Sequence, residues 1–205
     1  MYEKFTQIMT DRTRKLKVGH GSDPSTTIGP VTTLRGIAKA EAHIEDAKKH
    51  GAKIIMGGKK IDSTGYFFEP TIITDANENM LLSKEEQFAP IAAFFPFDTE
   101  EEAVEAANNT SMGLASYFFT KNVDRTWRLL ENLEAGMIGM NTGIQQIVQL
   151  ANTSTLTGLI GNSSAAESPF GGIKESGYGK ESGLGVAVEE YLITKTGTLT
   201  LDGHY

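Results

Sequence analysis

The sequence predicts an α/β fold in which a parallel sheet is flanked by helices. From Ile91 onward, short apolar runs alternate with helical stretches, which is the order of parallel strands and their crossover helices. These runs are apolar almost throughout, so the strands are expected to be buried on both faces. With 205 residues, 39% of them hydrophobic, the chain is long enough to bury a sizeable core.

The first half of the chain predicts two helices and a strand. Apolar residues at roughly helical spacing predict an amphipathic helix over residues 2–16, which begins abruptly at the first residues of the sequence. A loop rich in Gly, Ser, Thr and Pro, residues 18–32, leads to a second helix over 34–50, which Gly51 is expected to end. Residues 52–56 are then expected to form a short strand.

The second half carries the strand and helix alternation. Its predicted elements are, in order, a strand at 91–97, a helix at 99–109, a strand at 114–120, a helix at 123–133 and a strand at 137–141. Thr99 followed three residues later by Glu102 is a capping box, the local signature of a helix start. Ser83 and Glu86 have the same spacing, so Ser83 is a second candidate N-cap. Residues 191–201 predict a strand after a short helix.

Composition excludes several classes of partner and site. The net charge of -7, with acidic and basic residues interspersed, argues against nucleic acid or an anionic membrane as a partner. No run of eighteen apolar residues predicts a membrane span. The four histidines lack metal-ligand spacing and there is no cysteine, so we expect no metal site and no disulfide. Residues 19–24 begin like G-x-G-x-x-G but have proline in place of the third glycine, which predicts a turn.

Several motifs occur in an order that is typical of one enzyme family. They are G-Y-F-F-E-P-T at 65–71, K-E-E-Q-F-A-P at 84–90, G-M-I-G-M-N at 136–141 and P-F-G-G-I-K-E-S-G-Y-G-K-E at 169–181. Together they resemble the C-terminal portion of aldehyde dehydrogenases. Segments 91–103, 113–118 and 166–170 are most similar to succinate-semialdehyde dehydrogenases. The resemblance covers nearly the whole chain except residues 144–160.

The resemblance implies a fold, an activity and an assembly. Residues 1–190 would be part of the catalytic domain, and residues 191–205 an oligomerisation strand and tail that make the full-length relative a homo-oligomer. The activity would be oxidation of a small-molecule aldehyde, succinate semialdehyde to succinate, with NAD or NADP. In the family, a cysteine forms a thiohemiacetal with the aldehyde and a glutamate acts as general base. The compartment would be the cytoplasm or the mitochondrion.

Two cofactor contacts are implied by the match to the family's E-E-x-F-G-P box. Glu86 would accept hydrogen bonds from the nicotinamide ribose hydroxyls, which suits a carboxylate because both of its oxygens are acceptors. Phe88 would lie against the nicotinamide ring. Ala89 departs from the usual glycine of this box. On spacing alone, the same segment reads as the purely structural N-cap at Ser83.

Two substrate-pocket residues are implied by the region around P-F-G-G. Phe170 would line the substrate tunnel, and the glycines after it would allow a close approach of the backbone. Without the resemblance, residues 169–172 are equally a simple glycine-rich connection. Ser164 falls near the position where succinate-semialdehyde enzymes place a serine hydroxyl on the distal carboxylate of the substrate. Ser163 is the alternative, and both serines could equally be solvated loop residues.

The catalytic residues of the family have no match in these residues. The sequence contains no cysteine, and no glutamate matches the general base, so no catalytic residue is assigned and this chain alone is expected to lack aldehyde oxidation. Removal of residues 144–160 restores an ordinary family loop; this segment is either a retained intron or a genuine insertion. The rival hypotheses are a non-catalytic subunit that joins intact enzyme through its terminal strand, and an unstable piece of a larger protein.

Overall fold

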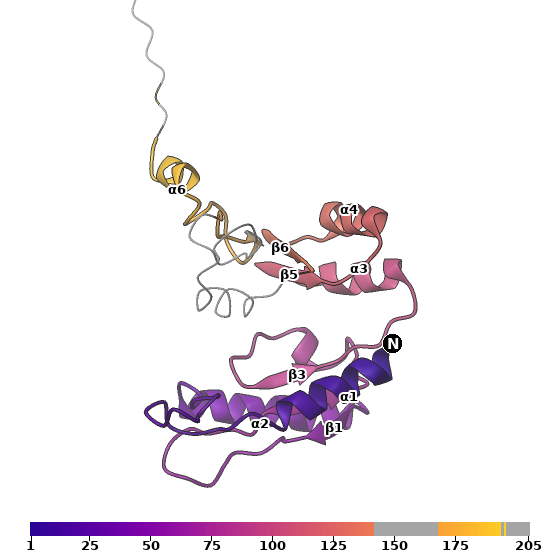
Figure 1. Ribbon diagram of the computed structural model, residues 1–205, viewed down its shortest axis with the longest axis vertical. Helices are drawn as coiled ribbons and strands as arrows, with labels where there is room; N and C mark the ends of the chain where they lie inside the picture. The colour runs from indigo at the N-terminus through magenta and orange to yellow at the C-terminus, as the bar shows by residue number, and fades with distance from the viewer. Residues whose placement is uncertain (142–167, 194, 196–205) are drawn as a thin grey trace, which may run out of the picture. The chain divides into compact units, whose positions relative to one another are not determined.

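A computed structural model describes residues 1–141, 168–193 and 195 of the chain. The chain divides into two compact units, Met1–Asp98 and Thr99–Tyr205, called here the N-terminal and C-terminal units (Figure 1). Each unit combines helices with short strands and contains a parallel strand pair, which confirms the predicted α/β class. Within the described ranges, no helix is long and apolar enough to cross a bilayer. The division of the chain at residue 190 stays a prediction.

The sheet of the N-terminal unit is built around one fully buried strand. This strand, β2 (Thr71–Thr74), pairs antiparallel with β1 (Lys53–Met56) and parallel with β3 (Ile91–Ala93). All four residues of β2 are buried, as expected for the middle strand of a sheet covered on both faces. The strand predicted at 91–97 is shorter than expected, because Pro96 has no amide hydrogen with which to extend the ladder.

The helix α2 (Leu34–Lys49) supplies most of the core of the N-terminal unit. Its buried face consists of Ile37, Ala40, His43, Ile44 and Ala47. This face packs against β1 and a short 3-10 helix, η1 (Leu81–Ser83). The predicted end of the helix is confirmed: Gly51 has a φ of +89°, a left-handed conformation that side chains other than glycine rarely adopt.

The first helix is shorter than its apolar pattern predicts. The helix α1 spans Tyr2–Thr13, because beyond it the amides of Lys15 and Leu16 bond to carbonyls three residues back and tighten the last turn. The Tyr2 hydroxyl links α1 to the sheet, since it accepts from the amide of Asp75 at 2.8 Å and donates to the carbonyl of Phe94 at 3.1 Å. The phenyl ring of Phe5 also packs edge-on against Phe94.

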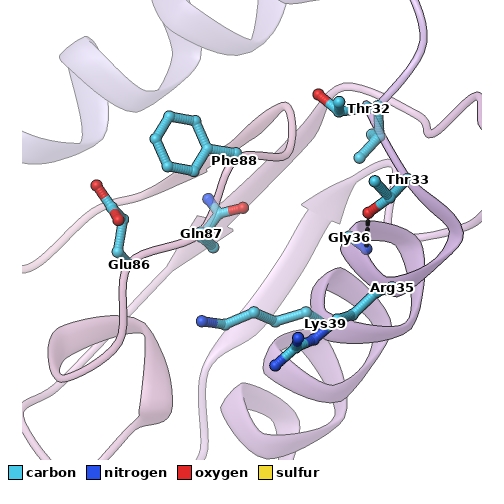
Figure 2. A pocket seen from close by; sticks show the side chains of 9 residues that line it. Thr32, Thr33, Arg35, Gly36, Lys39, Glu86, Gln87 and Phe88 are labelled. Atoms are coloured by element: carbon cyan, nitrogen blue, oxygen red, sulfur yellow. Dashed lines mark hydrogen bonds between the residues drawn. The ribbon is translucent and has the colours of Figure 1, made fainter.

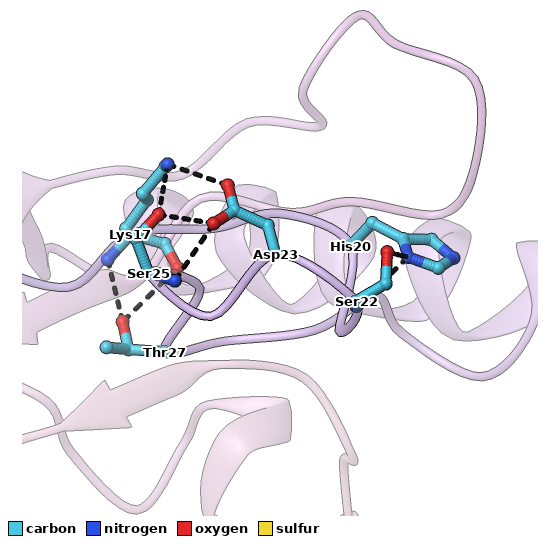
Figure 3. A network of polar contacts seen from close by, with 6 residues as sticks. All are labelled: Lys17, His20, Ser22, Asp23, Ser25 and Thr27. Atoms are coloured by element: carbon cyan, nitrogen blue, oxygen red, sulfur yellow. Dashed lines mark hydrogen bonds and ion pairs between the residues drawn. The ribbon is translucent and has the colours of Figure 1, made fainter.

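The glycine-containing loop after α1 forms the turn that the sequence predicts. The Lys17 ammonium lies 2.9 Å from the carboxylate of Asp23, and this carboxylate accepts from both the amide and the hydroxyl of Ser25 (Figure 3). These contacts lower the pKa of Asp23 to about 2, with the Ser25 hydroxyl making the largest contribution and Lys17 the next. The polar side chains therefore satisfy the backbone of this loop locally.

The C-terminal unit contains a parallel strand–helix–strand motif. Strand β5 (Ala115–Phe118) pairs in parallel with β6 (Met137–Met140), and α4 (Val123–Asn132) connects them. The strand predicted at 114–120 is confirmed as β5, which is shorter than predicted. A further strand that the sequence did not predict, β4 (Met112–Gly113), lies just before it and pairs antiparallel with β7 (Ile173–Lys174).

Helix caps and an ion-pair cluster organise the helices of this unit. The capping prediction at Thr99 is confirmed: its hydroxyl accepts from the amide of Glu102 at 3.1 Å and starts α3 (Glu100–Asn108). The Glu100 carboxylate then binds the guanidinium groups of Arg125, at 2.6 Å, and Arg128, at 2.8 Å, and so joins α3 to α4. These two arginines lower the pKa of Glu100 to about 2, Arg128 making the largest contribution.

A short helix, α6 (Gly185–Glu190), precedes the predicted terminal strand, as expected. Residues 191–193 form no strand, and most of the segment 191–201 lies outside the described residues. The segment 144–160 also lies outside them, as do Ser163 and Ser164. Their predicted roles therefore stay predictions.

Candidate functional site

Both residues predicted to contact the cofactor line one open pocket of the N-terminal unit (Figure 2). The pocket has a volume of about 420 Å³. Its lining consists of Val31, Thr32, Thr33, Arg35, Gly36, Lys39, Glu86, Gln87 and Phe88. Glu86 and Phe88 come from the loop after η1, and the remaining wall is the N-terminal end of α2 with the residues that precede it. The tertiary structure thus brings a carboxylate, an aromatic ring and two cations together.

The α2 wall of the pocket is fixed by a helix cap. The Thr33 hydroxyl accepts from the amide of Gly36 at 3.1 Å, which satisfies one of the amides left free at the helix start. Arg35 and Lys39 are four residues apart, so their side chains emerge from the same face of the helix. Positive side chains and the partial positive charge of the helix N-terminus therefore act on the same side of the pocket.

The opposite wall is a turn that holds its shape through Gln87. The Gln87 amide oxygen accepts from the amide of Ala89 at 2.9 Å, and Ile91 donates to the carbonyl of Ala89 at 2.7 Å. Phe88 between them projects outward and is 83% exposed. Ala89 does not have a positive φ, so alanine occupies the position of the family glycine without backbone strain.

The N-cap role predicted for Ser83 is wrong. Ser83 is the last residue of η1, and its hydroxyl donates to the carbonyls of Glu78 and Met80, each at 2.8 Å. No helix follows it. The capping-box spacing of Ser83 and Glu86 is therefore fortuitous. In the folded chain Glu85 contacts side chains of α2, and Glu86 lines the pocket.

Glu85, next to the pocket, is bound by two side chains of α2. Its carboxylate lies 3.3 Å from the Lys39 ammonium and 3.4 Å from Nε2 of His43. These contacts lower the pKa of Glu85, with His43 contributing most and Lys39 next. Sequence analysis missed Arg35, Lys39, His43 and Glu85. A signal was available in the four-residue spacing of Lys39 and His43, although nothing in the sequence paired them with Glu85.

The Pro169–Gly172 turn in the C-terminal unit is held by close backbone packing. The Lys180 ammonium donates to the carbonyls of Gly136, at 3.1 Å, and Gly171, at 2.9 Å. A methyl group at Gly171 would overlap the carbonyl oxygen of Gly179, and one at Gly136 would overlap that of Gly171. The close backbone approach predicted for these glycines is therefore confirmed.

Phe170 occupies a defined position in this turn. Its carbonyl accepts from the amide of Glu181 at 2.7 Å, and the Ser182 hydroxyl donates to the carbonyl of Ser168 at 2.7 Å. The ring is half-buried. Sequence analysis also missed Lys180, whose ammonium holds the turn through the carbonyl of Gly171. The contact of Phe170 with a substrate stays a prediction.

A comparison with protein families identifies the chain. Residues 1–197 match the aldehyde dehydrogenase family. The chain belongs to the aldehyde dehydrogenase family. Its matched portion includes the pocket of the N-terminal unit and the Pro169–Gly172 turn, so both sites are parts of this family's fold.

The most similar relatives include succinate-semialdehyde dehydrogenases. The chain is 42% identical over 196 residues to succinate semialdehyde dehydrogenase of Acinetobacter baylyi, which covers 95% of the chain and 36% of that relative. It is 40% identical over 201 residues to succinate-semialdehyde dehydrogenase [NADP(+)] 1 of Schizosaccharomyces pombe, covering 98% and 36%. The mitochondrial succinate-semialdehyde dehydrogenase of Arabidopsis thaliana is 40% identical over 195 residues, covering 95% and 33%. The chain therefore spans about a third of the length of these relatives.

A solved structure confirms the fold. The crystal structure of an aldehyde dehydrogenase from Brucella melitensis biovar abortus 2308 matches with a TM-score of 0.80 and 46% identity. The match covers 95% of this chain and 36% of that chain. The predicted aldehyde dehydrogenase fold, in part, is thus confirmed.

Proposed function

We propose that this aldehyde dehydrogenase chain contributes contacts to the nicotinamide ribose and to the aldehyde in an enzyme that oxidises succinate semialdehyde to succinate with NAD or NADP. The names of the relatives support the substrate, and the Schizosaccharomyces pombe relative supports NADP. The observation that carries the proposal is the position of Glu86 and Phe88 in one pocket with Lys39 and Arg35. The compartment proposed is the cytoplasm or, as in the name of the Arabidopsis thaliana relative, the mitochondrion.

The lining of the pocket fits one end of a dinucleotide. The exposed Glu86 carboxylate offers acceptors for ribose hydroxyls, and it has no hydrogen-bond or ion-pair partner among the described residues. Phe88 offers a largely exposed ring face for a flat heterocycle. Arg35 and Lys39 offer cations for phosphate oxygens. When bound, the dinucleotide would supply the hydride acceptor.

A contact with the aldehyde would be made by the Pro169–Gly172 turn of the C-terminal unit. Lys180 holds the backbone after Phe170 through the carbonyl of Gly171, and Ser182 holds the backbone before it through the carbonyl of Ser168, so the ring is positioned before a substrate arrives. A serine hydroxyl at Ser164, or at Ser163 in the alternative, would bind the distal carboxylate that distinguishes a semialdehyde acid from a simple aldehyde. The segment 144–160 ends shortly before Ser163 and Ser164 in the sequence.

Oxidation of the aldehyde needs a nucleophile that these 205 residues do not contain. The 205 residues contain no cysteine, so they offer no thiolate to attack the aldehyde carbonyl. We therefore expect no formation of NADH or NADPH from succinate semialdehyde by this chain alone. Dehydrogenase activity of the purified chain that is abolished by Glu86→Gln would contradict this expectation.

A second candidate function is that of a non-catalytic subunit that associates with complete enzyme. Its support is the set of exposed apolar side chains at the end of α6 and just after it: Val188 at 60%, Tyr191 at 81%, Leu192 at 65% and Ile193 at 84%. Contiguous apolar exposure of this kind marks a surface that another protein covers. Co-purification with a full-length succinate-semialdehyde dehydrogenase, lost in Leu192→Asp, is the expected result.

Titration with nicotinamide mononucleotide tests the primary proposal. In amide correlation spectra of the 205-residue chain, we expect shifts at residues 86–88 and at the start of α2. Glu86→Gln should weaken this binding by roughly tenfold, because it replaces a charged acceptor with a neutral one. Adenosine monophosphate is the matched ligand control and Glu78→Gln the matched variant. Equal responses to both nucleotides, or none in the pocket, would overturn the proposal.

A further inference from the structure

One buried imidazole of the N-terminal unit faces the segment that carries the pocket residues. His43, in the middle of α2, is 1% exposed and is the one ionisable side chain among the fully buried residues that the structure describes. Its Nδ1 has no hydrogen-bond partner there, whereas its Nε2 lies 3.4 Å from Oε2 of Glu85. Burial of a polar ring costs free energy unless the ring is hydrogen-bonded. The contact with Glu85 offsets this cost for the His43 imidazole.

The carboxylate of Glu85 bridges two successive turns of the same helix face. Lys39 lies four residues before His43, and its ammonium is 3.3 Å from the same Oε2 atom. Further along α2, Asp46 accepts from the amide of Leu81 at 2.7 Å. Three side chains of α2 therefore hold both ends of the short segment from η1 to Glu85.

The anchoring to α2 stops immediately before the pocket residues. Glu86 and Phe88 are exposed, and the side chain of Gln87 bonds to the amide of Ala89 and to the carbonyl of Ile91 rather than to α2. Glu85 is thus the last residue before them whose side chain is bound to α2. Because an ordered segment loses less conformational freedom on binding, the position of Glu85 determines how well Glu86 and Phe88 are arranged in advance.

Lys39 and His43 differ in what else they contact. Lys39 also lines the pocket (Figure 2), so the phosphate of a bound ligand would compete with Glu85 for its ammonium. His43 is buried on the core side and does not line the pocket. The imidazole is therefore the partner that keeps Glu85 in place while Lys39 turns to a ligand.

From these contacts we infer that His43, Lys39 and Glu85 act as positioning residues that hold Glu86 and Phe88 ready for the nicotinamide ribose. The inference rests on the proposed function for the nature of the ligand. The contact itself does not, because it is made within the ligand-free chain.

Amide hydrogen exchange of the 205-residue chain provides the test. Glu85→Ala should raise the exchange rates of the amides at 86–89 and at Ile91 by roughly tenfold, the change expected from loss of a charge-assisted contact. The amides around Ile44 in α2 should keep their protection, which shows that the fold is intact. Glu86→Ala is the matched control, since it removes the same charge from the same segment without removing a contact to α2. Glu85→Gln retains an acceptor oxygen and should restore most of the protection.

Nicotinamide mononucleotide binding supplies the second readout. If the inference holds, Glu85→Ala weakens binding several-fold and Glu85→Gln restores much of it. Unchanged exchange at 86–91 in Glu85→Ala overturns the inference, while binding by the parent chain would leave the proposed function standing. Raised exchange with unaltered binding also overturns it, because the contact would then be purely structural. Raised exchange in a chain whose parent form does not bind the mononucleotide overturns the proposed function and, with it, the positioning role.

Discussion

The N-terminal unit and the C-terminal unit are each stabilised internally by a different kind of interaction. Every buried apolar side chain among the described residues lies in the N-terminal unit, with the exception of Met137. The C-terminal unit instead leaves Phe119, Val123 and Trp127 exposed at 72%, 70% and 60%. Its elements are connected by hydrogen bonds and by the ion pairs of Glu100. Apolar burial is the larger stabilising term, so the pocket lies on the better stabilised scaffold.

This difference has a consequence for the two candidate sites. The pocket of Glu86 and Phe88 is supported by α2, whose face is buried in the core. The Pro169–Gly172 turn depends on glycine packing and on the two hydrogen bonds of Lys180. We therefore expect the pocket of Glu86 and Phe88 to keep its structure under solvent conditions that already disturb the Pro169–Gly172 turn.

The largest effect is expected from Ile44→Ala. Ile44 is 1% exposed in the core, and removal of its side chain should lower the free energy of unfolding of the N-terminal unit by about 2–5 kcal/mol. Urea denaturation followed by circular dichroism measures it. Leu34→Ala, on the same helix but 58% exposed, is the control and should change stability little. Similar losses in both variants would contradict the argument that the buried face of α2 stabilises the N-terminal unit.

Gly171→Ala tests the turn of the C-terminal unit. The added methyl group would overlap the carbonyl oxygen of Gly179, so we expect a loss of about 1–3 kcal/mol and faster amide exchange around Phe170. The control is Gly185→Ala, where nothing lies near the added methyl group, and which should be neutral or slightly stabilising because it starts a helix. Unaltered exchange in Gly171→Ala contradicts the packing argument.

Thr33→Ala tests the wall of the pocket. Loss of the hydroxyl that caps Gly36 should cost about 1 kcal/mol and weaken binding of nicotinamide mononucleotide, because the start of α2 frays. Thermal unfolding together with the titration measures both effects. Thr33→Ser keeps the capping oxygen and should behave like the parent chain, so a serine variant as defective as the alanine variant would argue against a capping role.

The smallest effect is the pH dependence of the link between α3 and α4. The pKa of Glu100 falls from 4.5 to about 2 in the folded chain, so its ion pairs contribute stability fully above pH 4.5 and lose it as the pH falls toward 2. Urea titrations across this window should show a slope for the C-terminal unit that is absent in Glu100→Gln. Glu131→Gln, an exposed carboxylate on α4, should retain the slope. Identical profiles for the parent chain and Glu100→Gln would show that the cluster does not stabilise the unit.

Local signals in the sequence predicted most helices well. The caps at Thr99 and Gly51 fall where expected because capping depends on a few neighbouring residues. The same spacing at Ser83 failed, since its hydroxyl bonds back to Glu78 and Met80 instead of starting a helix. The strand predicted at 114–120 is present as β5, whereas β4, just before it, was missed because it exists only through its pairing with the distant β7.

Motifs and local patterns in the sequence were enough to predict the family, the α/β class and the ends of α2. These features depend on motifs and on contacts between near neighbours in the chain. The folded chain was needed to show that Glu86 and Phe88 share a pocket with the start of α2, that Lys39 and His43 bind Glu85, and that Lys180 joins Gly136 to Gly171. Such contacts join residues far apart in the sequence, and local spacing carries no record of which segments the burial of apolar surface brings together.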